Sequence, residues 1–93
     1  MSRTIAAERV ERLAHLAERA VRSGDAERAR ERVRLARRIA ERHRLELPRR
    51  FKRFSCDACD VWLIPGQNLR VRADDGHAVY TCDCGEISRF PYR

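Results

Sequence analysis

The amino-acid sequence predicts a small α+β protein, in which an N-terminal antiparallel helix hairpin precedes a C-terminal three-stranded antiparallel sheet. Apolar residues recur every three or four positions through the first half, which is the period of an amphipathic helix. In the second half, apolar and polar residues alternate in short runs that are separated by turn residues, as in strands. A chain of 93 residues buries a small core and often needs a metal or a partner for stability.

Two helices are predicted, over residues 4–23 and about 26–44. The apolar stripe of the first helix consists of Ala6, Val10, Leu13, Ala17 and Ala20. Gly24 is placed as the left-handed residue after the first helix, and Asp25 as the N-cap of the second. Because so short a turn joins them, the helices should be antiparallel neighbours. Their small alanines bury little apolar area, so the hairpin is expected to depend on further contacts.

The helical pattern ends at Pro48, because the residue before a proline is driven out of the helical region of backbone conformations. A basic segment, RRFKRF at residues 49–54, follows. The β pattern begins after Cys59 with an apolar run at residues 61–64. It continues with an alternating run at 69–72, an Asp-Asp-Gly turn at 74–76 and a second run at 78–81.

Four cysteines flank the β pattern: Cys56 and Cys59 form a CxxC pair, and Cys82 and Cys84 form a CxC pair. Two thiolate pairs brought together by a small sheet suit tetrahedral zinc, so one structural Zn²⁺ per chain is predicted in a zinc ribbon. A closed site of four sulfurs has no open position for substrate, so no catalysis is assigned to the metal. The alternatives are free thiols, a disulfide pair, or a site of three cysteines and His77.

The net charge of +7, from 21 basic and 14 acidic residues, is concentrated in the first half and at the junction. Residues 1–47 carry 13 arginines and 8 acidic residues, residues 48–55 carry four basic residues, and residues 56–93 carry 4 arginines and 6 acidic residues. This distribution favours a polyanionic partner, with nucleic acid ahead of an anionic membrane surface. No apolar run resembles a signal peptide or a membrane span, so a cytoplasmic location is expected.

The changes in apolar pattern and in charge along the chain predict three parts: a helical hairpin at 1–47 as a protein-partner arm, a basic linker at 48–55, and the zinc ribbon at 56–93. The RNA-binding candidates are the basic residues of the linker and of the predicted strands, namely Arg49, Arg50, Lys52, Arg53, Arg70, Arg72 and Arg89. Phe51 and Phe54 are expected to pack under the ribbon. Most helix arginines are interpreted as solvated charge, since pairs such as Glu18 and Arg22 stand four residues apart. No catalytic residue is assigned.

Several segments together resemble the protein component 4 family of archaeal ribonuclease P, which is related to the zinc-ribbon subunit of the eukaryotic enzyme. The matching segments are LARRIA (35–40), LP (47–48), KR (52–53), the CxxC pair, IPGxNxRVR (64–72), YTC (80–82), CG (84–85) and RFPY (89–92). The resemblance covers about residues 30–93 and extends to the first helix only by type. One departure is the CxC pair, because members of the family commonly carry a second CxxC.

The resemblance implies an N-terminal helix pair, which binds a second protein subunit, component 1, and a C-terminal zinc ribbon. The two proteins together would bind the specificity side of the catalytic RNA. The holoenzyme removes the 5′ leader from precursor tRNA; its RNA subunit supplies the catalysis with magnesium, while the protein stabilises and positions that RNA. By position, Lys52, Arg53, Arg70, Arg72 and Arg89 would contact RNA. Two other functions remain open: a free-standing zinc-ribbon factor of transcription or translation, and an interaction hairpin whose zinc only fastens the tail.

Overall fold

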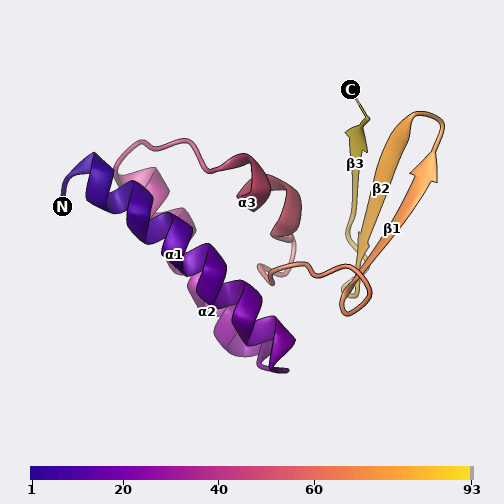
Figure 1. Ribbon diagram of the computed structural model, residues 1–93, viewed down its shortest axis with the longest axis horizontal. Helices are drawn as coiled ribbons and strands as arrows, with labels where there is room; N and C mark the ends of the chain where they lie inside the picture. Colours follow the sequence, from indigo (N-terminus) through magenta and orange to yellow (C-terminus); the bar gives the residue numbers. More distant parts are fainter. Residues whose placement is uncertain (93) are drawn as a thin grey trace.

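The structure is a computed structural model that describes residues 1–92; Arg93, the last residue of the predicted ribbon, lies outside the described residues. The element order is α1 (Arg3–Arg22), α2 (Ala26–Arg42), α3 (Arg49–Phe54), β1 (Leu69–Asp74), β2 (His77–Cys82) and β3 (Ile87–Pro91). In Figure 1 the helix hairpin and the sheet lie at opposite ends, with α3 between them. The predicted fold class is confirmed.

The helices α1 and α2 form the predicted antiparallel hairpin, and each is capped by a polar side chain. The Ser2 hydroxyl accepts a hydrogen bond from the Ile5 N–H at 3.2 Å, and the Asp25 carboxylate accepts one from the Arg28 N–H at 3.1 Å. Gly24 has a φ of 86°, the left-handed conformation that a glycine adopts without steric cost. The facing stripes are rich in alanine and buried, so the two helices approach closely.

The basic segment that was expected to be a linker is the short helix α3. Pro48 precedes its first residue, where a proline suits the backbone conformation, and Ser55 ends it in an extended conformation. The Phe51 side chain is fully buried and meets the Trp62 ring edge-on at a centroid distance of 5.3 Å. The expected packing of Phe51 is therefore confirmed, and it orients the basic residues of α3 away from the core.

The sheet has the strand order β1-β2-β3 with both pairs antiparallel, and its third strand comes from the tail. The apolar run at residues 61–64 was expected to begin the β pattern, but it forms no strand beyond an isolated bridge between Ser55 and Trp62. All four of its residues are buried, so the run contributes packing. It also makes the two backbone hydrogen bonds of that bridge, from the Leu63 N–H to the Phe54 carbonyl and from the Cys56 N–H to the Val61 carbonyl. A short apolar run does not by itself distinguish a strand from an irregular core segment.

One hydrophobic core runs through the molecule from the hairpin to the end of the sheet that carries the cysteines. It joins the buried faces of α1 and α2 to Phe51, to residues 61–64, and to Leu69 and Cys82. The molecule is flat, with principal extents of 43 × 31 × 17 Å. Among residues 1–92, no helix is both long enough and apolar enough to cross a membrane.

Candidate metal centre and basic surface

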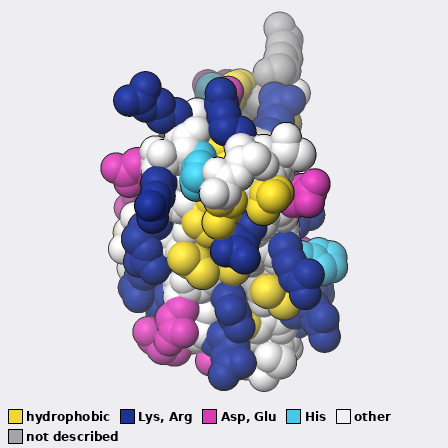
Figure 2. Space-filling model, turned by 90° about the vertical axis from the view of Figure 1, so that its left-hand side faces the viewer, with side chains coloured by type: hydrophobic (Ala, Val, Ile, Leu, Met, Phe, Trp, Pro, Cys, Tyr) yellow, Lys and Arg dark blue, Asp and Glu magenta, His cyan; other side chains and the backbone are white. Residues whose placement is uncertain are grey.

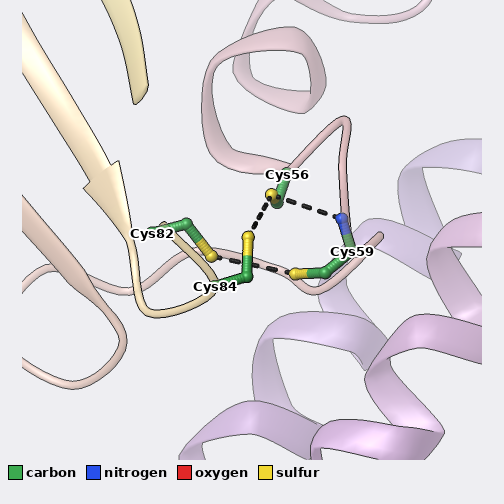
Figure 3. Close-up of side chains that lie close together, drawn as sticks. All are labelled: Cys56, Cys59, Cys82 and Cys84. Atoms are coloured by element: carbon green, nitrogen blue, oxygen red, sulfur yellow. Dashed lines mark hydrogen bonds between the residues drawn. The ribbon is translucent and has the colours of Figure 1, made fainter. Parts of the chain in front are cut away.

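The four cysteines lie together where the CxxC segment at residues 56–59, the first knuckle, meets the end of β2 (Figure 3). Their Sγ atoms all lie within 4.8 Å of one another. The Cys56 and Cys84 sulfurs are 3.6 Å apart, and the Cys59 and Cys82 sulfurs are 3.8 Å apart. Within the described part of the chain, this is the one group of at least three His, Cys, Asp or Glu side chains that is arranged to hold a metal ion.

These sulfur separations match a tetrahedral metal site. A Zn–S bond of about 2.3 Å places neighbouring sulfurs of a regular tetrahedron about 3.8 Å apart. The Cys59 N–H points at the Cys56 sulfur from 3.5 Å, which stabilises a thiolate at that position. The shorter CxC pair also reaches the site, because the chain turns sharply there: the Gly85 N–H donates to the Cys82 carbonyl at 2.8 Å, and Gly85 has a φ of 98°.

The thiols differ in how easily they lose their protons. Burial raises the pKa of Cys56 and of Cys82 above the ordinary value for a thiol. The backbone N–H of Glu86 lowers the pKa of the exposed Cys84 thiol, because it donates a hydrogen bond to the thiolate. Metal binding must therefore displace protons from the two buried thiols.

The alternative ligand His77 does not belong to this cluster. It begins β2, whereas Cys82 ends the same strand, so the two residues are roughly 16 Å apart at the rise of an extended strand. The His77 imidazole instead lies 3.2 Å from the Asp75 carbonyl in the hairpin turn. The site that the structure assembles is one of four sulfurs.

Two arginines of α2 hold the first knuckle against the hairpin. Asp60, at a φ of 64°, accepts a hydrogen bond from Arg34 at 2.9 Å and a second one from Arg37. Arg37 also donates to the Ser55 hydroxyl at 3.0 Å and to the Cys56 carbonyl at 3.3 Å. We call Arg34, Arg37 and Asp60 the knuckle clamp. Sequence reasoning interpreted helix arginines as mostly solvated, and it missed this clamp because its partners are more than twenty residues apart.

The loop before β1 is held by two amide side chains. The Asn68 amide accepts from the Ile64 N–H at 2.7 Å and donates to the Trp62 carbonyl at 2.9 Å. Gln67 donates to the Val21 carbonyl near the end of α1 at 2.5 Å, and the same carbonyl accepts a hydrogen bond from the Gly24 N–H at 3.0 Å. The IPGxN segment therefore ties the start of the sheet to the end of α1.

Three of the predicted RNA contacts lie on one face of the sheet. In the strand register, Arg72 and Arg89 both stand opposite Val79, and Arg70 stands opposite Thr81. Directly paired residues point to the same face, and so do residues two apart on a strand, so Arg70, Arg72 and Arg89 share a face. We call it the arginine face. Arg70 and Arg72 are exposed, and Arg89 pairs with Asp74 at 3.3 Å.

The basic residues of α3 are engaged elsewhere and do not join the arginine face. The Arg53 guanidinium lies 5.0 Å from the centroid of Phe90, which points to the opposite side of the sheet from Arg89. Lys52 pairs with Glu46 at 2.9 Å and lowers the pKa of that carboxyl. Arg50 lies over Trp62, and Arg49 is exposed. Figure 2 shows further Lys and Arg side chains spread over the helical side of the molecule, with hydrophobic side chains between them.

Comparison with known proteins gives consistent matches. Residues 9–85 match the family model described as "RNAse P Rpr2/Rpp21/SNM1 subunit domain". The chain is 62% identical over 89 residues to "Ribonuclease P protein component 4" of Halobacterium salinarum (strain ATCC 29341 / DSM 671 / R1), in an alignment that covers 96% of each protein.

Two solved structures are also similar. A chain from the "cryo-EM structure of archaeal Ribonuclease P with mature tRNA" superimposes with a TM-score of 0.91 at 41% identity, covering 98% of this chain and 79% of that one. The structure described as "Pfu Rpp21 structure and assignments" gives a TM-score of 0.65 at 37% identity, covering 91% of this chain and 97% of that one.

Proposed function

From the premise that the chain belongs to the ribonuclease P Rpr2/Rpp21/SNM1 subunit family and is a subunit of ribonuclease P, we propose that it is a non-catalytic, RNA-binding subunit. Its role is to stabilise and position the catalytic RNA while the holoenzyme removes the 5′ leader from precursor tRNA. The arginine face carries this proposal: three guanidinium groups on one side of a small sheet are suited to neighbouring phosphates. The place of action is the cytoplasm, where thiols stay reduced and available to a metal.

The metal is proposed to be one structural Zn²⁺ held by Cys56, Cys59, Cys82 and Cys84. Four sulfur ligands at near-tetrahedral separations favour zinc and leave no open coordination position. Elemental analysis of the purified protein should give one zinc per chain, and Co²⁺ substitution should give the absorption of a tetrahedral thiolate site. A Cys84→Ser variant should hold the ion more weakly; zinc content and affinity equal to the wild type would contradict the ligand set.

The RNA contacts are proposed to be Arg70, Arg72 and Arg89 on the arginine face, with the basic residues of α3 as a second group. This second group consists of Arg49, Arg50, Lys52 and Arg53. Binding of ribonuclease P RNA should weaken steeply with salt, and Arg70→Ala should reduce the slope of log K against log salt by about 0.7–0.9. Arg38, which is exposed on α2, supplies the matched control. An unchanged slope in Arg70→Ala would remove this residue from the interface.

The test of the function itself is reconstitution of cleavage. The RNA with magnesium should cleave precursor tRNA slowly, and this chain with its protein partner should lower the magnesium concentration needed. Cleavage by this chain alone would refute a non-catalytic role. A preference for duplex DNA over ribonuclease P RNA at equal salt would instead favour a free-standing zinc-ribbon factor.

The helical hairpin, residues 1–47, is proposed to bind the second protein subunit, component 1. Ile5 is 53% exposed and Leu35 is 36% exposed, although both lie on helices whose other large apolar residues are mostly buried. Leu35→Glu should weaken binding to the partner without unfolding the chain. Val71, a similarly exposed apolar residue on the sheet, provides the control as Val71→Glu. If Leu35→Glu and Val71→Glu lower the affinity for the partner subunit equally, the hairpin is not the docking surface.

A further inference from the structure

A small cavity of about 200 Å³ lies where α1, α3 and the segment before the sheet meet. It is smaller than the pockets of about 300–1,000 Å³ that take drug-sized ligands, so its scale is that of a single planar ring system. The residues that bear on its chemistry are Glu18, Arg22, Arg50, Phe54, Trp62 and Pro65.

The lining of this cavity combines aromatic surface with paired charges. Trp62 is 3% exposed, and the Arg50 guanidinium lies 5.6 Å from its ring centroid. On α1, the Glu18 carboxylate accepts two hydrogen bonds from Arg22, at 3.1 and 3.3 Å. The cavity therefore presents a carboxylate acceptor and two guanidinium groups beside aromatic rings.

We propose that this cavity takes one unpaired base of the bound RNA, with guanine preferred over the other bases. The inference rests on the proposed RNA-binding function and adds a base-reading site to it. Proteins recognise single-stranded RNA by stacking splayed bases on aromatic rings or guanidinium planes and by hydrogen bonding to their edges. Because Trp62 is 3% exposed and lies under Arg50, the stacking surfaces are the Arg50 guanidinium and the half-buried Phe54 ring. Glu18 supplies the edge contact. The neighbouring exposed Arg49 supplies charge for the flanking phosphates.

Guanine is selected by the Glu18 carboxylate. The Watson–Crick edge of guanine presents two adjacent donors, N1–H and the N2 amino group, which match the two oxygens of a carboxylate. Both Arg22 hydrogen bonds reach Oε2 of Glu18, so guanine would use Oε1 and replace one of the two bonds at Oε2. Adenine and cytosine place a ring-nitrogen acceptor beside their amino group, and uracil places carbonyl acceptors on both sides of its N–H. Each of these bases would turn an acceptor toward the Glu18 carboxylate, which costs free energy.

The only tryptophan of the chain provides the readout, because Trp62 lines the cavity. The zinc-loaded full chain is titrated at fixed salt with the pentaribonucleotides UUGUU, UUAUU and UUUUU while the Trp62 fluorescence is followed. UUGUU should bind about 5- to 100-fold more tightly than the other two, which is the range of one bidentate base contact. UUGUU should also change the Trp62 fluorescence, because the base enters beside the ring.

Two variants test the role of Glu18. Glu18→Gln replaces one of the two acceptor oxygens with a donor. The ratio of the affinity for UUGUU to the affinity for UUUUU should therefore fall toward one, while the affinity for UUUUU itself stays unchanged. The matched control is Glu27→Gln, because Glu27 forms a similar exposed pair with Arg30 at 3.2 Å on α2, away from the cavity. Both exposed pairs contribute little to folding, so both variants should remain folded.

Three outcomes would overturn the base pocket. Equal affinities for the three oligonucleotides with unchanged Trp62 fluorescence would reject it while leaving phosphate binding, and thus the proposed function, intact. An equal loss of preference in Glu18→Gln and Glu27→Gln would reject Glu18 as the reader. If component 1 alone changes the Trp62 fluorescence and abolishes the preference for UUGUU, the cavity belongs to a protein interface. Failure of ribonuclease P RNA itself to bind would refute the proposed function separately.

Discussion

Removing the guanidinium of Arg37 should loosen the metal knuckle from the hairpin. Arg37 donates to Asp60, to the Ser55 hydroxyl and to the Cys56 carbonyl, so one side chain joins α2 to the residues around Cys56. In an Arg37→Ala variant these acceptors lose their donor together. Asp60 keeps Arg34 at 2.9 Å, so the carboxylate does not become an unpaired buried charge.

The magnitude follows from the burial of the pair. A hydrogen bond to a charged group contributes about 1.5–3 kcal/mol to stability when it is shielded from solvent. A fully exposed ion pair contributes about 0.2–1 kcal/mol. The Arg37 and Asp60 side chains are 25% and 23% exposed, so the pair lies between these limits and nearer the first. Because the contacts to Ser55 and Cys56 are lost as well, Arg37→Ala should lower the free energy of unfolding by about 2–3 kcal/mol.

The assay is urea unfolding of the zinc-loaded protein, followed by Trp62 fluorescence. Arg38→Ala provides the control, because Arg38 is an exposed neighbour on the same helix and its loss should change stability by less than about 0.5 kcal/mol. A double-mutant cycle with Asp60→Asn should give a coupling free energy of about 1 kcal/mol or more. If Arg37→Ala and Arg38→Ala unfold at the same urea concentration, the knuckle clamp contributes nothing and the argument fails.

Three further predictions concern the core, the loop and the metal. Phe51→Ala should cost about 3–5 kcal/mol, because it empties the fully buried contact between α3 and Trp62; a smaller loss in thermal or urea unfolding than in Arg37→Ala would contradict this order. Asn68→Asp keeps the acceptor for the Ile64 N–H but turns a carboxylate oxygen toward the Trp62 carbonyl, so it should lower the melting temperature although the side-chain shape is kept; a melting temperature equal to that of the wild type would refute the donor role of the amide. Burial raises the pKa of the Cys56 and Cys82 thiols, so the metal-free site holds their protons at neutral pH and zinc must expel them. Apparent zinc affinity should therefore rise from about pH 6 to pH 8, by up to about tenfold per pH unit for each proton released; a competition titration that finds no pH dependence would mean that the thiols ionise before the metal arrives.

The sequence predicted features whose signals are local. The helix hairpin follows from the spacing of small apolar residues and from Gly24 and Asp25, which need only their own neighbours to act as caps. The clustering of the four cysteines also followed, because the intervening strands bring the two pairs to one end. Their role as zinc ligands stays a prediction, as do the RNA contacts.

Features that depend on distant partners were not visible in the sequence. The basic segment became a helix because Phe51 finds a buried place against Trp62, eleven residues further on, which a local reading does not see. The third strand comes from the tail, where Ile87–Pro91 pairs with β2, while the apolar run at 61–64 packs into the core. In the sequence, Arg37 and Arg50 cannot be distinguished from arginines that are simply solvated. Only the fold brings Arg37 to Asp60 and Arg50 to Trp62.

The shortest dimension of the molecule, 17 Å, has a consequence for assembly. Along this direction α1 lies in front of α2 (Figure 1), so the hairpin is only two closely packed helices thick. A polynucleotide on one broad side and a protein on the other would be separated by about two Debye lengths, since that length is about 8 Å at physiological ionic strength. Each broad side can then recruit its own partner electrostatically, with little interference from the charges of the other.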